Sequence, residues 1–307
     1  MLVCTKNKGI LSVNKKYIYI KMELLNSNLN INPKITKPNK VALCFIISYK
    51  HVLNQEAVWK KWIEPNKNWI NVYVHYKHIN HIKSPWLRSH TIPPNYISET
   101  SYFHVVPAYI SLLSFAKHHD SLNQWFCMLT DSCMPIISPE HFKERFQQYG
   151  SKSIMSIKGA DWNPDFHGRA NLKRLPPNLH IMHDPWFTLT LSHVNQIIQF
   201  IFNPTTRTIY STVCAGGLAN ESVFAIMLGV TIADLESHQS RQLLQTNKNL
   251  MNMSTTIVDW SRRPSSTSPH LFTMEDNPYI NQQVIQGLLQ KNPLAMFLRK
   301  VSPEFVL

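Results

Sequence analysis

A candidate general base lies in the stretch CAGGLANESVFAIML, which covers residues 214–228. Its Gly-Gly pair permits a tight turn, and Asn220 is a plausible cap for a short helix over 220–228. Glu221 is then expected in the first helical turn, beside the loop and with apolar residues behind it. A carboxylate held at a cleft in this way can take a proton from a substrate. Alternatively, Glu221 only complements the helix dipole.

A pair of adjacent cations is a second pattern with chemical use. Arg299 and Lys300 follow the apolar run AMFL at 295–298, which is expected to be a buried strand. Cations directly after such a strand can point at an anion, although adjacent Arg and Lys are usually just solvated. The stretch TTIVDW at 255–260 also ends a strand-like run. Its Trp260 can offer an indole face to a sugar ring or pack in the core.

The elements that must position these residues are typical of an α/β sheet. The stretch QWFCMLTDSCMP at 124–135 is an apolar run that ends in Thr130, Asp131 and Ser132. It indicates a buried central strand whose carboxyl end opens into a cleft, where ligands of open sheets bind. Strands are expected over 41–48, 71–75 and 124–129, with helices over 54–63 and 105–117 and another that begins at 138. This alternation predicts a mostly parallel, doubly wound sheet with flanking helices.

The second half of the chain is less regular. Residues 150–185 are expected to form a loop, and residues 186–191 a strand. Helices are expected over 192–202 and 280–290.

Composition places the chain among globular proteins. It has 307 residues, 44% hydrophobic and 11% aromatic, enough for a sizeable core. The net charge is +13, and residues 1–40, with eight lysines and one glutamate, carry +7 of it. We expect a basic, poorly ordered extension over residues 1–40 and a single domain over 41–307. The lysine-rich extension alone would suit nucleic acid, so a basic nucleic-acid-binding protein is one alternative function.

Several signals are missing from the sequence. No run of 18 apolar residues exists, so no spanning helix is predicted, and the five cysteines lack CxxC spacing. We expect a protein of a reducing compartment, cytoplasmic or peripheral to a membrane. GxGxxG, P-loop, HExxH and GxSxG motifs are absent, as is any Asp-x-Asp pair that would clamp a metal on a nucleotide-sugar diphosphate. His75, His78 and His81 recur at three-residue steps, but we expect no metal there.

Eight short segments, in order over residues 41–305, resemble the core-2/I-branching β-1,6-N-acetylglucosaminyltransferase family, including its plant branch. The most specific is FCMLTDSCMPI, which is similar to FVLLSESCIPL in the plant proteins. VYVHYK resembles IYVHA, TIVDWS resembles TYVDWS, SPHLFT resembles HPATF, and FLRKV resembles FARKF. ANESVFAIML stands where the family has a DEHY motif, DPWFTL where it has a Gly-Ser-aromatic-Phe strand, and GRANLKRLPP where it has an Arg-Tyr loop. Eight such motifs in one order are hard to obtain by chance.

The resemblance implies a GT-A-like fold and an inverting, metal-independent enzyme. Such an enzyme moves a sugar, N-acetylglucosamine or similar, from a UDP-sugar to a hydroxyl of a glycan acceptor. By the resemblance Glu221 is the catalytic base, Lys300 and the adjacent Arg299 bind the donor diphosphate, and His75 lies near the nucleotide. The residues implied at the acceptor are Arg169, Trp186 and Trp260.

The chain departs from the family pattern at several positions. The family's Asp-Glu pair is Asn220-Glu221 in this chain, and the plant WRKGSQW is replaced by IMHDPW. The second diphosphate-binding arginine is expected at Arg262 or Arg263. An inactive, sugar-binding relative is the remaining alternative, and retention of the candidate base and cation argues against it. Donors with N-acetylglucosamine, xylose or glucuronate all stay open.

Overall fold

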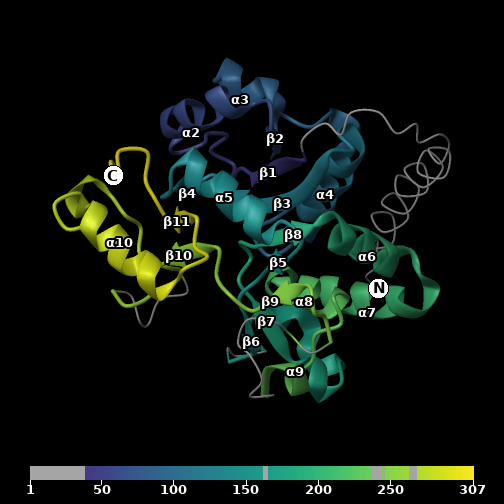
Figure 1. Cartoon of the computed structure of the whole chain (residues 1–307). Helices are drawn as coiled ribbons and strands as arrows, with labels where there is room; N and C mark the ends of the chain where they lie inside the picture. The colour runs from purple at the N-terminus through teal and green to yellow at the C-terminus, as the bar shows by residue number, and fades with distance from the viewer. Residues whose placement is uncertain (1–38, 162–164, 237–243, 245, 263–267) are drawn as a thin grey trace, which may run out of the picture. The chain divides into compact units, whose positions relative to one another are not determined.

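A six-stranded mixed sheet forms the centre of the fold (Figure 1). The computed structural model describes residues 39–161, 165–236, 244, 246–262 and 268–307, so nearly all of the expected N-terminal extension lies outside the described residues. Residues 38–307 group into one compact unit. The strand order is β2–β1–β3–β8–β5–β9. These strands are β1 (Lys40–Ile46), β2 (Ile70–His75), β3 (Asn123–Thr130), β5 (Ser153–Ile154), β8 (Thr188–Thr190) and β9 (Leu250–Met251).

The sheet is mostly parallel, as the sequence predicted, with one reversed strand. β1 pairs in parallel with both β2 and β3, and β5 pairs in parallel with β9. β8 runs antiparallel to its two neighbours, β3 and β5. The expected α/β architecture with a mostly parallel sheet is therefore confirmed. Because β1, β2 and β3 are parallel, their carboxyl ends meet at one edge of the sheet.

Helices cover both faces of this sheet. α4 (Val106–His119) contacts β1, β2 and β3, while α6 (Leu191–Phe202) contacts β3 and β8. On the other face α2 (Glu56–Ile63) and α5 (Pro139–Tyr149) share an aromatic core with β1 and β3, in which Trp62 and Phe142 meet edge to face at 5.1 Å. The described part of the chain also contains α3 (Pro85–Ser89), α7 (Pro204–Cys214), α8 (Val223–Met227), α9 (Ile232–Glu236) and α10 (Gln282–Lys291).

A second, three-stranded sheet continues from the end of β3. It contains β10 (Thr256–Val258), β11 (Phe297–Arg299) and β4 (Cys133–Pro135), in the order β10–β11–β4. β11 runs antiparallel to β4 with Arg299 opposite Cys133. This pairing brings the C-terminal cations next to the loop that follows the central strand.

The region over 150–185 is not the plain loop that was expected. It contains β5, the hairpin-like pair β6 (Ile157–Gly159) and β7 (Ile181–His183), and the 3-10 helices η4 (Phe166–Arg174) and η5 (Pro177–Leu179). Strands of two or three residues are too short for a period of two to show in the sequence. Helix α7, which follows α6 after a single residue, was likewise not predicted.

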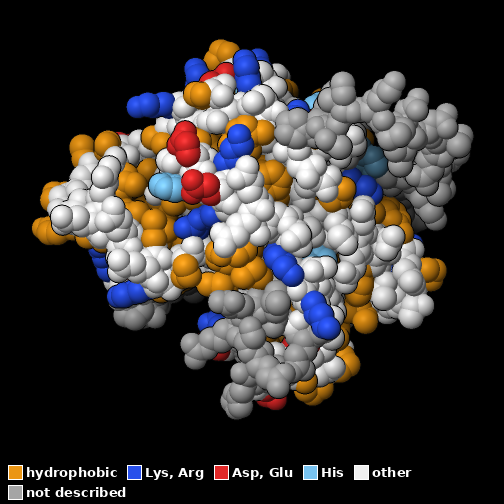
Figure 2. Space-filling model, viewed as in Figure 1, with side chains coloured by type: hydrophobic (Ala, Val, Ile, Leu, Met, Phe, Trp, Pro, Cys, Tyr) orange, Lys and Arg blue, Asp and Glu red, His pale blue; other side chains and the backbone are white. Residues whose placement is uncertain are grey.

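The cations on one face of the protein are dispersed rather than clustered. On the face shown in Figure 2, Lys and Arg side chains lie in ones and twos between uncharged and hydrophobic surface. Among the described residues of this face, the cations form no basic stripe of the kind that tracks a nucleic-acid backbone. Within the described ranges, no helix has both the length and the apolar character needed to cross a membrane.

Candidate active site

Glu221 lies on a short turn between α7 and α8. The turn is the 3-10 helix η6 (Ala219–Glu221), which directly precedes α8. An Arg169 Nη2 lies 2.7 Å from Glu221 Oε2, and the two side chains are only 18% and 21% exposed. The structure therefore brings together two residues that the sequence placed at the base and the acceptor.

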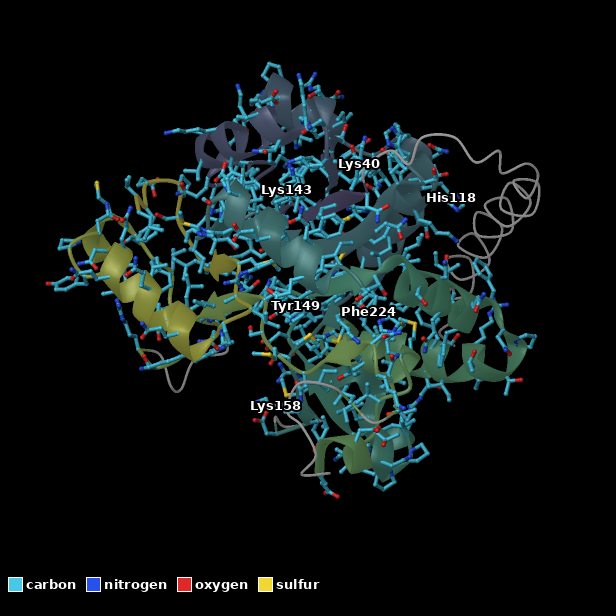
Figure 3. The ribbon with its side chains drawn as sticks, viewed as in Figure 1. Lys40, His118, Lys143, Tyr149, Lys158 and Phe224 are labelled. Atoms are coloured by element: carbon cyan, nitrogen blue, oxygen red, sulfur yellow. The ribbon has the colours of Figure 1, made fainter. Side chains whose placement is uncertain are left out.

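The predicted capping role of Asn220 is wrong. Asn220 lies inside η6, and α8 begins after Ser222 without a side-chain cap. Asn220 is buried, and its Oδ1 has no hydrogen-bond partner among the described residues. The helix is fixed instead by Phe224, whose ring lies 5.0 Å from that of Phe187 (Figure 3). Packing of an apolar face makes the cap unnecessary.

The Gly-Gly pair brings the Arg169 loop close to the Glu221 loop. A Cβ on Gly216 would lie 2.3 Å from the Gly168 carbonyl oxygen and 2.4 Å from the Asn171 backbone nitrogen. Ala170 also donates its N–H to the Gly217 carbonyl at 2.8 Å. Only glycine leaves room for this approach, so the pair does more than permit a tight turn.

Arg299 occupies the other side of the site. Its guanidinium carbon lies 4.1 Å from the centre of the Trp186 ring, and its Nε donates to Thr130 Oγ1 at 3.1 Å. Burial lowers the pKa of Arg299, but a guanidinium stays protonated in proteins. Glu221, Arg169, Arg299 and Trp186 are called the Glu221 cluster below.

The electrostatics of the cluster are coupled. Burial raises the pKa of Glu221, and the positive charges of Arg169 and Arg299 partly oppose that rise. Asp184, a second carboxyl, has a raised pKa because it is buried and because Glu221 is close enough to repel its charge. Burial raises the pKa of Tyr109, the charge of Arg299 opposes that rise, and the charge of Glu221 adds to it. The Tyr109 hydroxyl donates to the Pro185 carbonyl at 3.0 Å.

Asp184 and Tyr109 were not selected from the sequence. Tyr109 looked like one more apolar position of a helix, and nothing in its spacing distinguishes it. Asp184 did leave a signal, because it belongs to the IMHDPW stretch that replaces the plant motif.

The loops that follow β1 and β3 meet at the predicted edge. The Asp131 Oδ2 accepts the Ser48 N–H at 2.9 Å, and the Asp131 carbonyl accepts the Asn54 N–H at 2.9 Å. Asn54 in turn donates its side-chain N–H to the Val301 carbonyl at 2.7 Å. The edge of the sheet is thereby tied to the segment that carries the two cations.

Lys300 and His75 are described by a backbone hydrogen bond and by burial, respectively. The Lys300 carbonyl accepts the Phe272 N–H at 2.8 Å, which fixes its backbone. The charge of the neighbouring Arg299 acts on Glu221. His75 is buried at the end of β2, where its Nε2 accepts the Ser98 N–H at 3.2 Å. Burial lowers the pKa of His75 to about 4, so the ring is neutral.

Of the C-terminal candidates, Trp260 is exposed and Arg262 is held in ion pairs. Trp260 is 47% exposed at the end of β10, so the alternative that it packs in the core is wrong. Arg262 is committed to two carboxylates, with its Nε 3.1 Å from Asp259 and its Nη1 bonded to Asp276. It is thus an element of the scaffold. Arg263 lies outside the described residues.

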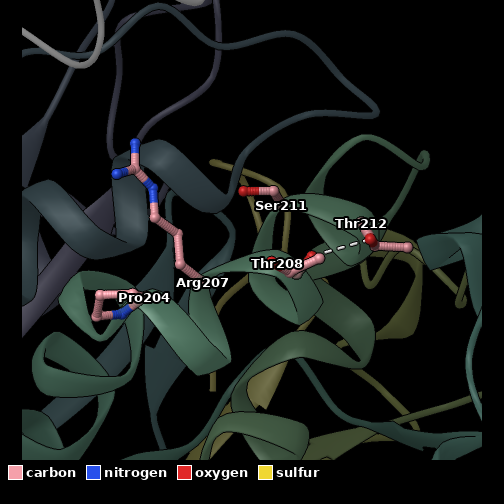
Figure 4. A pocket seen from close by; sticks show the side chains of 5 residues that line it. All are labelled: Pro204, Arg207, Thr208, Ser211 and Thr212. Atoms are coloured by element: carbon pink, nitrogen blue, oxygen red, sulfur yellow. Dashed lines mark hydrogen bonds between the residues drawn. The ribbon is translucent and has the colours of Figure 1, made fainter.

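The described surface has two hollows that could hold a ligand. One of about 390 Å³ runs along α7 (Figure 4), and it shares no lining residue with the Glu221 cluster; its lining is Pro204, Arg207, Thr208, Ser211 and Thr212. The other, of about 420 Å³, follows β2 at the carboxyl edge of the sheet and includes Tyr76, Lys77, His78 and His81. Ligands of open α/β sheets bind at that edge, so the second hollow fits a ligand site better.

Comparison with known proteins identifies the class. The family described as Core-2/I-Branching enzyme matches residues 43–281, which is most of the chain. No curated protein sequence matches. The chain belongs to the core-2/I-branching enzyme family, and membership of this family makes it a glycosyltransferase. The suspected family is thereby confirmed.

Proposed function

We propose that the protein is an inverting, metal-independent glycosyltransferase that uses a UDP-sugar. The observation that carries the proposal is a largely buried carboxylate, Glu221, that pairs with Arg169 at 2.7 Å and lies within electrostatic reach of the cation Arg299. Transfer needs one group to take a proton and another to stabilise a leaving diphosphate. The cluster offers one of each.

The proposed reaction is a single displacement. An acceptor hydroxyl oxygen attacks the anomeric carbon of the donor, and the bond from that carbon to the diphosphate oxygen breaks. Glu221 takes the hydroxyl proton, and UDP leaves with the bonding electrons from the opposite face, so the configuration inverts. A positioned general base typically contributes about 10²–10⁴ in rate.

Arg299 and Lys300 are proposed to hold the leaving diphosphate. Guanidinium groups bind phosphate oxygens in a planar, paired geometry, while an ammonium acts as a point charge. Arg299 is pre-oriented by the Trp186 ring and the Thr130 hydroxyl. Preorganised cations of this kind supply the stabilisation of developing charge that a metal supplies elsewhere.

The nucleoside is proposed to occupy the hollow after β2. The hollow directly follows His75, and His51 ties it to the loop after β1, because the His78 N–H donates to His51 Nε2 at 3.2 Å. The same loop reaches the Val301 carbonyl through Asn54. His75 then stands as a buried, neutral ring directly before the first lining residue, Tyr76.

The acceptor is proposed to lie over Arg169, Trp186 and Trp260. Two buried polar atoms near this region, Trp186 Nε1 and Asn220 Oδ1, have no hydrogen-bond partner among the described residues. Buried polar atoms are normally satisfied, so each is suited to a hydroxyl group of a bound sugar.

The test is a screen of UDP-sugars with N-acetylglucosamine, xylose or glucuronate, in excess EDTA. A donor present at 100 times its Kd should stabilise the fold by about 2.7 kcal/mol in a thermal-shift assay, and UDP release should follow when a glycan acceptor is added. Activity that disappears in EDTA and returns with Mg²⁺ would contradict metal independence. Thermal shifts from adenine nucleotides alone would contradict the UDP-sugar donor.

Lys300→Ala should weaken UDP binding by about 10-fold or more, since a hydrogen bond to a charged group contributes about 1.5–3 kcal/mol. Calorimetric titration with UDP measures the change. Lys291→Ala is a matched control, because it removes one lysine from the last turn of α10, a few residues before β11. Equal affinities in wild type and Lys300→Ala would remove Lys300 from the donor site.

A further inference from the structure

An exposed tyrosine at the tip of a tight turn has no role in the fold core. Residues 101–104 close on themselves, because the Ser101 N–H donates to the His104 carbonyl at 3.3 Å and the His104 N–H returns a bond at 3.0 Å. Tyr102 is 75% exposed at this tip. Its only described ring contact is Phe103, edge to face at 5.1 Å, so one side of the phenol is braced and the rest faces solvent.

The turn is attached to the backbone that carries Glu221. Leu218 donates its N–H to the Phe103 carbonyl at 2.8 Å, and the Leu218 carbonyl accepts the Glu221 N–H at 3.0 Å. Two successive hydrogen bonds therefore connect the Tyr102 turn to the proposed base. Movement of one segment without the other would break them.

The same tyrosine lies near the proposed diphosphate cation. The Tyr102 phenol lies within electrostatic reach of the Arg299 guanidinium. Tyr102 thus belongs to a turn that is hydrogen-bonded to the backbone of the base, Glu221, and it lies within electrostatic reach of the donor cation, Arg299. The acceptor sugar has to occupy the space between those two groups.

We propose that Tyr102 is an acceptor-binding residue whose ring stacks on the C–H face of the acceptor sugar. The proposal rests on the proposed function, since it assumes that Glu221 and Arg299 flank a glycosyl transfer. An aromatic ring provides a large, rigid contact with few torsions to freeze, while its hydroxyl stays in water. Such a platform must be exposed before the acceptor binds, and the Tyr102 ring is exposed.

The test measures acceptor KM in Tyr102→Ala, with UDP-N-acetylglucosamine as donor and the methyl glycosides of galactose, N-acetylgalactosamine and xylose as acceptors. Methyl glycosides are used because an aromatic aglycone would itself stack on tyrosine. Tyr102→Ala should raise the acceptor KM roughly 2- to 10-fold, the size of an aromatic contact. Tyr102→Phe should stay within about 2-fold of wild type, since it keeps the ring. The calorimetric Kd for UDP should not change in either variant.

Tyr279→Ala is the matched control, because Tyr279 is also a surface tyrosine, 70% exposed, on the C-terminal region beyond η7 (Met274–Asp276). It should leave KM at the wild-type value. An unchanged acceptor KM in Tyr102→Ala, or an equal rise in Tyr279→Ala, overturns the role of Tyr102 while leaving the transferase reaction intact. A parallel loss of UDP affinity in Tyr102→Ala also overturns it. Failure of the wild type to transfer sugar to any of these acceptors from UDP-N-acetylglucosamine, UDP-xylose or UDP-glucuronate overturns the platform and the proposed function together.

Discussion

Replacing Arg169 with glutamine should move the acid limb of the pH–rate profile to higher pH. Arg169 and Glu221 form an ion pair at 2.7 Å in which both side chains are about four-fifths buried. The arginine charge lowers the pKa of Glu221 against the upward effect of burial. Without that charge, burial acts against Arg299 alone, so Glu221 binds a proton at a higher pH. A protonated Glu221 cannot act as the base.

The size of the effect follows from the contact itself. A hydrogen bond to a charged group contributes about 1.5–3 kcal/mol, and the low exposure of this pair limits solvent screening. At a pH below the acid limbs of both proteins, kcat/KM of Arg169→Gln should therefore be about 10- to 160-fold lower than that of the wild type, at 1.36 kcal/mol per decade. Above the limb, where Glu221 is ionised in both proteins, the difference should shrink to the part that Arg169 contributes by contacting the acceptor.

The assay is UDP release over pH 5–9 at subsaturating acceptor, about the range in which proteins are most stable. Arg174→Gln removes one exposed arginine from the same 3-10 helix, η4, and should leave the limb in place. An acid limb that stays fixed in Arg169→Gln, or that moves to lower pH, would refute the electrostatic reasoning. A limb that moves equally in Arg174→Gln would assign the effect to net charge rather than to the ion pair.

Two further variants test other parts of the structure. Arg299→Lys keeps a positive charge but loses the planar contact with Trp186 and the Nε bond to Thr130. UDP affinity should fall roughly 2- to 30-fold, the range of a cation–π contact of about 0.5–2 kcal/mol, and a calorimetric Kd equal to wild type would contradict this. For Asp276, burial raises the pKa, but hydrogen bonds from Thr273, His270 and Arg262 outweigh burial and lower it. A lowered folded-state pKa gives stability that is present above the unfolded value of about 3.9 and is lost as the pH falls through the folded value. Asp276→Asn should thus cost about 1–3 kcal/mol at pH 7 and little at about pH 2; a cost in urea unfolding that is the same at both pH values would count against this network.

Long, strongly patterned segments explain why the sheet centre could be predicted from the sequence. β1 and β3 are seven and eight residues long and buried on both faces, so they appear as unbroken apolar runs. The edge formed by Thr130 and Asp131 followed from the sharp end of one such run. The short strands β5, β6, β7 and β9 give no such signal, since two or three residues carry no periodicity, whereas β8 lies inside the strand expected over 186–191.

The candidate site could be predicted only in part, for a different reason. Glu221 and Arg169 were each selected, but their ion pair depends on a close approach at Gly216 that no local pattern reveals. Asn220 has the residue type of a cap, yet the packing of Phe224 decides where α8 begins. Tertiary contacts also bring Arg299 within electrostatic reach of Glu221, which no local pattern predicts. Distances between loops that lie far apart in the chain are set by the whole fold.

The central claim is that Glu221 takes the proton in glycosyl transfer, and a paired measurement on Glu221→Gln tests it most directly. Glutamine keeps the size of the side chain and an oxygen for Arg169, but it has no negative charge to accept a proton. UDP affinity by calorimetry should match the wild type, while single-turnover transfer should fall by at least about 10². Transfer at the wild-type rate in Glu221→Gln, with UDP bound equally well, would contradict the account.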